Sequence, residues 1–560
     1  MTSKNNLRTG GQLLVDGLRV NGVDRVFCVP GESYLAALDA FHDVPEIQLV
    51  VCRHESGAAM MADTHARMTG RPGVVFVTRG PGATNASAGV HIAFQDSTPM
   101  ILFIGQVARD FLDREAFQEI DYRRMFGQMA KWVAEIADTA RVPEYVSRAF
   151  YVSQSGRPGP VVLSLPEDML AERAVPSDIL AAKAVEAHPG EADMKELAQL
   201  LGKAERPLMI VGGGGWNARA CDDLKAFAEA NALAVAVTFR CQDKFDNSHA
   251  CYAGDLGVGP NPKLLQRVRE SDLLVVVGAR LGEMTTVGYT LIDIPKPKQA
   301  FVHVYPGPEE LGRVYQPTLA VNAGMKAFAA AVRAVKVGQP KWRQWTKDAR
   351  ADYLAWTKPP KIPGRVQMGE IMDWLNERLP ADSVVCNGAG NFATWANRFY
   401  RYRSFASLMG PTSGSMGFGL PAAVAAKLAD PKRLVVVFAG DGDFMMTGQE
   451  LATAVQYGAD IVVLVGNNGM LGTIRMHQER EYPGRVCATD LANPDFAALA
   501  RAYGAHGEVV ERTDQFAAAF EAAVKSGKPA VIELRLDPEA ITPMATLSGI
   551  RKAALEKAKA

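Results

Sequence analysis

The sequence has few cysteines, and they follow no pairing pattern. Its seven cysteines are scattered, with no Cys-x-x-Cys spacing and no Cys/His pairs at the spacing of a zinc site. An odd, scattered set excludes a complete disulfide framework and favours reduced thiols. We therefore expect a cytoplasmic protein without structural zinc.

Net charge, a leader segment and long apolar runs are also lacking. Sixty-one basic and sixty-one acidic residues cancel, so no global field attracts nucleic acid or an anionic membrane. The N-terminal stretch MTSKNNLRTGG has no apolar signal-peptide core, and no uninterrupted apolar run reaches membrane-spanning length. The composition predicts small-molecule ligands, with neither nucleic acid nor a membrane as a partner.

The chain is long and apolar enough for several cores. It has 560 residues, 48% of them hydrophobic, which allows about three domains. Short apolar runs alternate with helix-patterned segments, as in α/β folds with doubly wound parallel sheets. We predict three such domains over residues 1–185, 190–340 and 360–545. A basic tail helix over 546–560 would be frayed or packed on the surface.

The stretch from Arg433 to Met470 predicts one βαβ unit. An apolar run ends in Asp441-Gly442-Asp443, a helix-patterned segment follows, and a second apolar run ends in Asn467-Asn468. Thr447 to Glu450 has capping-box spacing and predicts a helix start. Both polar ends would lie on one sheet edge, where Asp441 and Asn468 offer hard oxygen ligands for a Mg²⁺ that holds a diphosphate.

This arrangement resembles the diphosphate-binding signature of thiamine-diphosphate enzymes, and the residues around it resemble the acetolactate synthase large subunit. The resemblance implies thiamine diphosphate and Mg²⁺, with Asp441, Asn468 and the carbonyl of Met470 as metal ligands. It also implies that Met416 bends the cofactor and that Gly414 accepts a hydrogen bond from its amino group. The further cofactor-binding residues implied in this domain are Gly388, Gly390, Asn391, Ser415, Gly440, Gly442, Asp443 and Leu471.

Glu55 is the implied cofactor-activating acid. It follows an apolar run, Leu49 to Cys52, and by itself would be a common first-turn glutamate favoured by the helix dipole. In the resembling family, a carboxylate in this Arg-His-Glu stretch bonds N1′ of the aminopyrimidine and drives proton removal at C2. The same domain would contribute Pro30, Gly31, Thr78, Pro81 and Asn85, the last two from a loop over 81–85.

The residues expected to choose the substrate match the family less closely. Phe117, Gln118 and Lys131 match segments at the active-site entrance. His477 lies in Met476-His477-Gln478, where acetolactate synthases carry Gln-Trp-Gln, so it could contact a different acceptor or donate a proton. A solvated loop or helix position is the alternative for Lys131 and His477.

One absence favours carboligation over aldehyde release. Simple decarboxylases of the superfamily often keep histidines in the segment that is Gln95 to Pro99 here, which has none; His91 lies earlier, in a predicted helix. The resemblance thus implies a lyase or transferase that decarboxylates a pyruvate-like 2-oxoacid and joins the product to a second carbonyl. A non-ligating decarboxylase or acyl-CoA lyase is the alternative, and a non-catalytic cofactor-binding regulator the remote one.

The central region matches the family's FAD site only in part. Gly278-Ala279-Arg280 fits, but Leu281 to Glu283 replaces Phe-Asp-Asp, and Val304 to Gly307 replaces an Ile-Asp-x-Asp strand end. The glycines at 212–215 lack GxGxxG spacing. An empty or differently occupied site is therefore favoured over FAD. The family further implies a homodimer or homotetramer with active sites at the subunit interface, and a small regulatory subunit.

Overall fold

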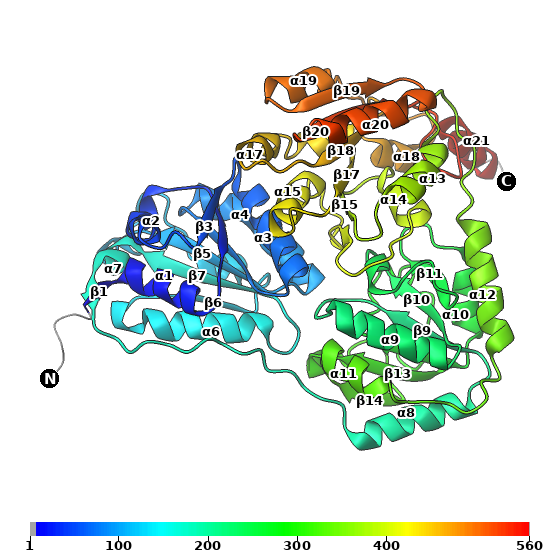
Figure 1. The fold of residues 1–560 in the computed structure, drawn as a ribbon, viewed down its shortest axis with the longest axis horizontal. Helices are drawn as coiled ribbons and strands as arrows, with labels where there is room; N and C mark the ends of the chain where they lie inside the picture. Colours follow the sequence, from blue (N-terminus) through cyan, green and yellow to red (C-terminus); the bar gives the residue numbers. More distant parts are fainter. Residues whose placement is uncertain (1–6, 559–560) are drawn as a thin grey trace. The chain divides into compact units, whose positions relative to one another are not determined.

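The computed structural model describes residues 7–558, so the first six residues of the N-terminal stretch and residues 559–560 of the tail lie outside it. The chain forms two compact units, Met1–Val185 and Glu186–Ala560. Figure 1 shows both as a ribbon, coloured along the sequence, with labels on most of their helices and strands. No helix among the described residues is long and apolar enough to cross a membrane.

The first unit contains a six-stranded parallel sheet in the order β3-β2-β4-β5-β7-β6. Its strands are Arg25–Cys28 (β2), Gln48–Val51 (β3), Gly73–Val77 (β4), Met100–Gln106 (β5), Trp132–Glu135 (β6) and Pro160–Pro166 (β7). Its main helices are Gly10–Val20 (α1), Leu35–His42 (α2), Glu55–Thr69 (α3), Pro81–Asp96 (α4), Val142–Gln154 (α6) and Glu167–Ala171 (α7). β4, β5 and β7 are buried along their whole length, as continuous apolar runs in a covered parallel sheet should be. The chain reverses its direction across the sheet between β2 and β4, which places a crevice at their carboxyl ends.

The second unit holds two further six-stranded parallel sheets. The first, in the order β11-β10-β9-β12-β13-β14, consists of Pro207–Val211 (β9), Ala234–Thr238 (β10), Tyr252–Leu256 (β11), Leu273–Val277 (β12), Ala300–Tyr305 (β13) and Leu319–Asn322 (β14). The helices of this part include Glu191–Lys203 (α8), Ala218–Ala230 (α9), Pro262–Glu270 (α10), Met325–Val332 (α11) and Arg343–Trp356 (α12). The turns after β9 and β12 flank the reversal point of this sheet.

The last sheet, in the order β16-β15-β17-β18-β20-β19, carries the βαβ unit predicted from the sequence. Its strands are Val384–Asn387 (β15), Leu408–Met409 (β16), Val435–Gly440 (β17), Val462–Asn467 (β18), His506–Val510 (β19) and Ala530–Arg535 (β20). The helices here include Met368–Arg378 (α13), Ala393–Phe399 (α14), Gly419–Ala429 (α15), Asp441–Met445 (α16), Glu450–Gln456 (α17), Gly472–Glu481 (α18) and Phe516–Lys525 (α20). Three parallel sheets with covering helices confirm the predicted α/β class.

Two local predictions are wrong. Residues 81–85 form the first turn of α4 and not a loop, because Pro81 occupies the start of the helix, where its missing N–H costs nothing. The capping box at Thr447 does not form: its hydroxyl donates to the Gly417 carbonyl at 2.6 Å, and α17 begins without a side-chain cap.

The tail folds as a helix, Leu547–Lys557 (α21), which packs against α18. Arg551 donates to the Glu479 carboxylate from Nε at 2.7 Å, and Leu547 is buried with Met470 and Met476. The tail as far as Lys557 is therefore attached to the surface of the last domain through these contacts.

Candidate active site

Glu55 lies at the carboxyl-end crevice of the first sheet, as the first residue of α3. Its side chain is 9% exposed, and Oε2 accepts a hydrogen bond from Asn85 Nδ2 at 2.9 Å. The preceding His54 caps α3 by accepting from the Ser56 N–H, so the start of this helix does not depend on Glu55. The carboxylate is held from one side by a neutral amide and can act on a ligand.

Small residues bring the neighbouring turns close to Glu55. A Cβ atom added to Gly82 would lie 3.5 Å from Glu55 Oε1, and one added to Gly31 would lie 2.4 Å from Thr78 Cβ. The Thr78 hydroxyl is 2.8 Å from that of Ser33, a residue without a sequence signal. Of the predicted residues of this unit, Glu55, Thr78, Asn85 and Gly31 are thus linked by these contacts, and Pro30 and Pro81 are the chain neighbours of Gly31 and Gly82.

Gln118 reaches the same crevice from the loop after β5. A Cβ atom on Gly80, which precedes α4, would lie 2.7 Å from Gln118 Cβ, and the Gly80 N–H donates to the Tyr122 hydroxyl. Burial raises the pKa of Tyr122 to about 12, so it stays a neutral hydroxyl. Phe117 is 71% exposed in this chain. Gln118 therefore lies beside the α4 N-terminus, whereas Phe117 projects outward.

Lys131 is separated from Glu55 along the strands of the first sheet, and its expected role at the active-site entrance stays a prediction. Lys131 precedes β6, at the amino edge of the parallel sheet, whereas Glu55 lies at the carboxyl edge. Its ammonium donates to the carbonyls of Val152 and Ser155 at the end of α6, where the helix dipole favours a cation. Arg79, which stands where the family usually has serine, pairs with Glu167 at 2.8 Å.

Asp441 and Asn468 lie at the carboxyl ends of the paired strands β17 and β18. The Asp441 carboxylate is 3% exposed and accepts from Gly442 N at 2.9 Å, Gly469 N at 2.9 Å and Asn493 Nδ2 at 2.8 Å. Burial raises its pKa, which these donors partly offset. Asn468 directly follows β18, the strand paired with β17, and is half-buried. Its Oδ1 accepts from Met470 N.

Asp443 joins two of the predicted glycine turns. Its Oδ1 accepts from Ala389 N at 3.0 Å and Gly417 N at 2.9 Å, and burial raises its pKa to about 7. A Cβ atom on Gly388 would lie only 2.0 Å from this oxygen, so the contact requires glycine there. Asn391 is held by Thr473, whose hydroxyl accepts from the Asn391 N–H.

The predicted apolar residues meet over the start of α16. A Cβ atom on Gly442 would lie 2.7 Å from Leu471 Cδ2 and 3.9 Å from Met416 Cε. Gly414, on the same segment as Met416, is exposed and has φ of +66°. His477 is exposed on α18, whereas the adjacent Met476 is buried against Met470.

These residues fit Mg²⁺ and a diphosphate. The donor set would be a carboxylate, an amide oxygen and the Met470 carbonyl, all hard oxygens of the kind Mg²⁺ takes. Residues 7–558 contain no cluster of three His, Cys, Asp or Glu side chains that could bind a metal, so a metal here needs such mixed donors. Gly388, Gly390 and Gly440 lie at the same edge, where the absence of a Cβ lets the Asp443 carboxylate approach Gly388 and the Phe392 ring approach Gly390 and Gly440.

The residues after β9 and β12 do not fit FAD. A Cβ atom on Gly278 would lie 2.6 Å from Met325 Sδ, and one on Gly213 would lie 1.9 Å from the Gly278 carbonyl oxygen. The buried Trp216 indole donates to the Gly212 carbonyl at 2.9 Å. The two turns therefore pack against each other and against large side chains, where a dinucleotide would need open space.

The β13 end lacks FAD-binding groups as well. Tyr305 is 2% exposed where the family has a carboxylate, and the following Pro306 has no N–H. The first turn of α9 is capped by the Asn217 side chain, which accepts from Ala220 N. One of the free N–H groups at the start of α9 is thus already hydrogen-bonded within the chain.

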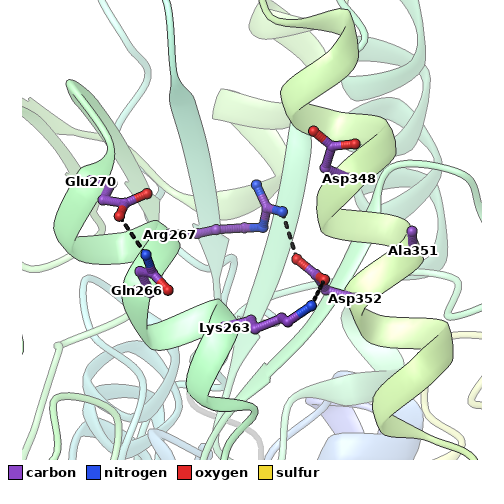
Figure 2. Close-up of a pocket in the computed structure, with 7 residues that line it drawn as sticks. All are labelled: Lys263, Gln266, Arg267, Glu270, Asp348, Ala351 and Asp352. Carbon is purple, nitrogen blue, oxygen red and sulfur yellow. Dashed lines mark hydrogen bonds and ion pairs between the residues drawn. The ribbon is translucent and has the colours of Figure 1, made fainter.

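A polar groove of about 380 Å³ lies between α10 and α12 (Figure 2). Asp352 accepts from Lys263 at 2.7 Å and from Arg267 at 2.6 Å, and Gln266 donates to Glu270. None of the predicted site residues lines it. The Asp352 contacts are ion pairs between the two helices, the Gln266–Glu270 bond lies within α10, and we assign the groove no ligand.

Sequence reasoning missed the residues that hold the site from outside its motifs. Asn493 donates to Asp441, and Thr473 holds Asn391, yet neither stands in a motif that would single it out. Arg240, at the end of β10, donates to the Gly388 carbonyl. Only the tertiary structure places these residues at the edge of the last sheet.

Comparison with known proteins identifies the family. Three family models match: the thiamine pyrophosphate enzyme N-terminal TPP binding domain over residues 8–125, the central domain over 194–332 and the C-terminal TPP binding domain over 388–534. The Escherichia coli acetolactate synthase isozyme 2 large subunit is 32% identical over 554 residues, covering 98% of this chain and 99% of the relative. The Saccharomyces cerevisiae acetolactate synthase catalytic subunit, mitochondrial, is 30% identical, covering 96% and 82%. The chain therefore belongs to the thiamine pyrophosphate enzyme family, with all three of its domains.

Proposed function

We propose that this protein decarboxylates a pyruvate-like 2-oxoacid and joins the resulting acyl unit to a second carbonyl, using thiamine diphosphate and Mg²⁺. The observation that carries the proposal is the pair Asp441 and Asn468 at neighbouring strand ends, with Asp441 buried and oriented by three N–H donors. Relatives named acetolactate synthase support this choice of reaction.

In this proposal, Asp441, Asn468 and the Met470 carbonyl bind Mg²⁺, and the glycine turns at 388 and 390 bind the diphosphate through backbone N–H groups. Thiamine diphosphate, when bound, would supply a carbon nucleophile for the 2-oxoacid and an acceptor for the electron pair left behind when CO₂ departs. Met416 and Leu471 shape the cofactor's surroundings near Gly442.

Glu55 is assigned the proton chemistry. Its buried carboxyl group would hold a proton at the pyrimidine N1′, and Asn85 keeps Oε2 oriented for that contact. In the family the two halves of the site come from different subunits, so we propose a homodimer as the smallest active form. A small regulatory subunit is the second partner to test, because the Escherichia coli relative is named a large subunit.

Carboligation is preferred over aldehyde release because the α4 end, Gln95 to Pro99, offers no histidine, and His91 is exposed on α4. Gln118 is the proposed substrate contact, since it lies beside Gly80 at the α4 N-terminus. Phe117 and His477 are exposed in this chain and would contact substrate only in the assembled form. The proposal assigns no substrate contact to Lys131.

The decisive experiment uses the purified protein with thiamine diphosphate, Mg²⁺ and a panel of 2-oxoacids that includes pyruvate. We expect CO₂ together with acetolactate or a related hydroxyketoacid. Aldehyde as the main product would support a non-ligating decarboxylase. Turnover only with an acyl-CoA would support a lyase. The absence of CO₂ release with every substrate would reject the proposal.

We further propose that catalysis proceeds without FAD, because Trp216 and Met325 fill the space between the β9 and β12 turns. The absorption spectrum of the purified protein should lack flavin bands. Dialysis against FAD should leave both the spectrum and the activity unchanged, and a stoichiometric flavin would contradict this part of the proposal.

A further inference from the structure

Arg240 belongs to the central part of the second unit but reaches the diphosphate-binding edge of the last sheet. It follows β10, is 3% exposed, and has φ of +58°. A non-glycine residue in this left-handed region is strained and persists only where other contacts enforce it. Those contacts lie around Gly388.

The guanidinium group holds the first predicted diphosphate-binding turn. Arg240 Nη2 donates to the Gly388 carbonyl, a charge-assisted bond of the strong class. Gly410, after β16, leaves room for this group: a Cβ atom there would lie 3.1 Å from Arg240 Nη1 and 3.0 Å from Asn387 Oδ1. The side chain is thus enclosed beside the carboxyl ends of β15 and β16.

Asp443 holds the same peptide group from its other end. Its carboxylate accepts from Ala389 N at 3.0 Å, and this N–H points away from the Gly388 carbonyl that Arg240 binds, because the two groups are trans in one planar peptide. A buried arginine and a buried aspartate therefore hold the two ends of one peptide group, and the positive charge of Arg240 lowers the pKa of Asp443 against the larger effect of burial. The burial of Arg240 and Asp443 at one glycine turn is the arrangement expected if that turn must keep a fixed orientation.

Further contacts anchor the segment that carries Arg240. Asn247 N donates to the Tyr402 carbonyl at 2.9 Å, and Tyr402 N donates to Asn247 Oδ1 at 3.1 Å. Gln242 Nε2 reaches the Asn397 carbonyl. The backbone from which Arg240 extends is therefore fixed to the last sheet's domain independently of Arg240 itself.

We propose that Arg240 is a positioning residue that fixes the Gly388-Ala389 turn for the cofactor's diphosphate. The inference rests on the proposed function, because it assumes that this turn binds thiamine diphosphate. Preorganisation of the turn lowers the ordering cost on binding, so the effect should appear in cofactor affinity. The central domain then contributes to the site through this side chain, although its own sheet edge does not fit FAD.

The test compares Arg240→Met and Arg240→Lys with the control Arg267→Met. Arg267 is also part-buried; it donates to the Asp352 carboxylate and lies over the Trp345 ring, and these contacts involve neither Gly388 nor the segment that carries Arg240. For each cofactor-free protein with Mg²⁺, the dissociation constant of thiamine diphosphate is measured by calorimetry, and the melting temperature by heat denaturation.

We expect Arg240→Met to raise the dissociation constant at least tenfold, with kcat largely restored at saturating cofactor. Arg240→Lys should recover part of the affinity, because lysine keeps a charged donor. Arg267→Met should lower the melting temperature without changing the dissociation constant. An unchanged dissociation constant in Arg240→Met, or an equal increase in Arg267→Met, would overturn the proposal.

A second variant covers the case in which Arg240→Met does not fold. Gly410→Ala leaves the Arg240 side chain and its charge in place but adds a Cβ atom that crowds Arg240 Nη1. It should weaken cofactor binding severalfold. Wild-type affinity in Gly410→Ala together with wild-type affinity in Arg240→Lys would reject the role. If the wild-type protein binds no thiamine diphosphate, the proposed function itself fails, which is a distinct result.

Discussion

A single added methyl group at Gly388 should disrupt the proposed diphosphate site. A Cβ atom on this residue would lie 2.0 Å from Asp443 Oδ1 and 2.4 Å from Asp443 Oδ2, distances that side chains do not adopt. Asp443 is 3% exposed and cannot swing into solvent. In Gly388→Ala, either the carboxylate or the turn must therefore move by about an ångström.

The size of the effect follows from the bonds that such a movement breaks. Asp443 Oδ1 accepts from Ala389 N and Gly417 N, and each hydrogen bond to a charged group contributes about 1.5–3 kcal/mol. Loss of both would cost about 3–6 kcal/mol, and relaxation of the turn would recover part of it. If the conformation that binds the cofactor becomes less stable by about 3 kcal/mol, the affinity for thiamine diphosphate drops on the order of a hundredfold.

The assay is a calorimetric titration of cofactor-free protein with thiamine diphosphate at fixed Mg²⁺, with melting temperatures recorded in parallel. Gly202→Ala is the matched control, because Gly202 lies in α8 with nothing within 4 Å of the added Cβ. It should bind the cofactor like the wild type and melt at the same temperature or slightly above. If Gly388→Ala binds thiamine diphosphate as tightly as the wild type, then the close contact with Asp443 does not require glycine at this position, and the prediction is wrong.

Three further predictions test other parts of the site. Glu55→Gln should slow cofactor C2 proton exchange, measured by NMR, by about 10²–10⁴-fold at an unchanged melting temperature, and wild-type exchange would reject the role of Glu55. Lys131→Ala should keep wild-type kcat/KM and lose about 1 kcal/mol of unfolding free energy in a urea titration, because it removes a cation from the α6 C-terminus; a large loss of activity would restore its substrate role. Hydrogen bonding to Arg551 lowers the pKa of Glu479 to about 2 from its ordinary 4.5, so its stabilisation is present above about pH 4.5 and is lost as pH falls toward 2. The melting temperature of the wild type should accordingly fall more steeply below about pH 4.5 than that of Glu479→Gln, and parallel pH profiles would contradict this.

The fold class and the cofactor family could be predicted from sequence because both depend on local patterns. Apolar strand-length runs such as Gly73–Val77 and Val435–Gly440 specify buried parallel strands, and Asp441 and Asn468 follow two adjacent ones. The rule that parallel strands share a carboxyl edge then places the two side chains near each other. Glu55 follows from the same rule, as the residue that opens α3 after β3.

Other features were decided by contacts between residues far apart in the chain, which no local pattern records. Lys131 matches a family position in sequence, but the strand direction places it at the opposite edge from Glu55. The glycines at 212–215 lack GxGxxG spacing but could still admit a nucleotide, whereas in the folded chain Met325 and Trp216 pack against this turn. Sequence alone thus determined the α/β fold and the residues at the strand ends. The tertiary structure decided that Arg240 and Asp443 hold the Gly388 turn, because long-range packing of buried charges depends on where distant segments meet.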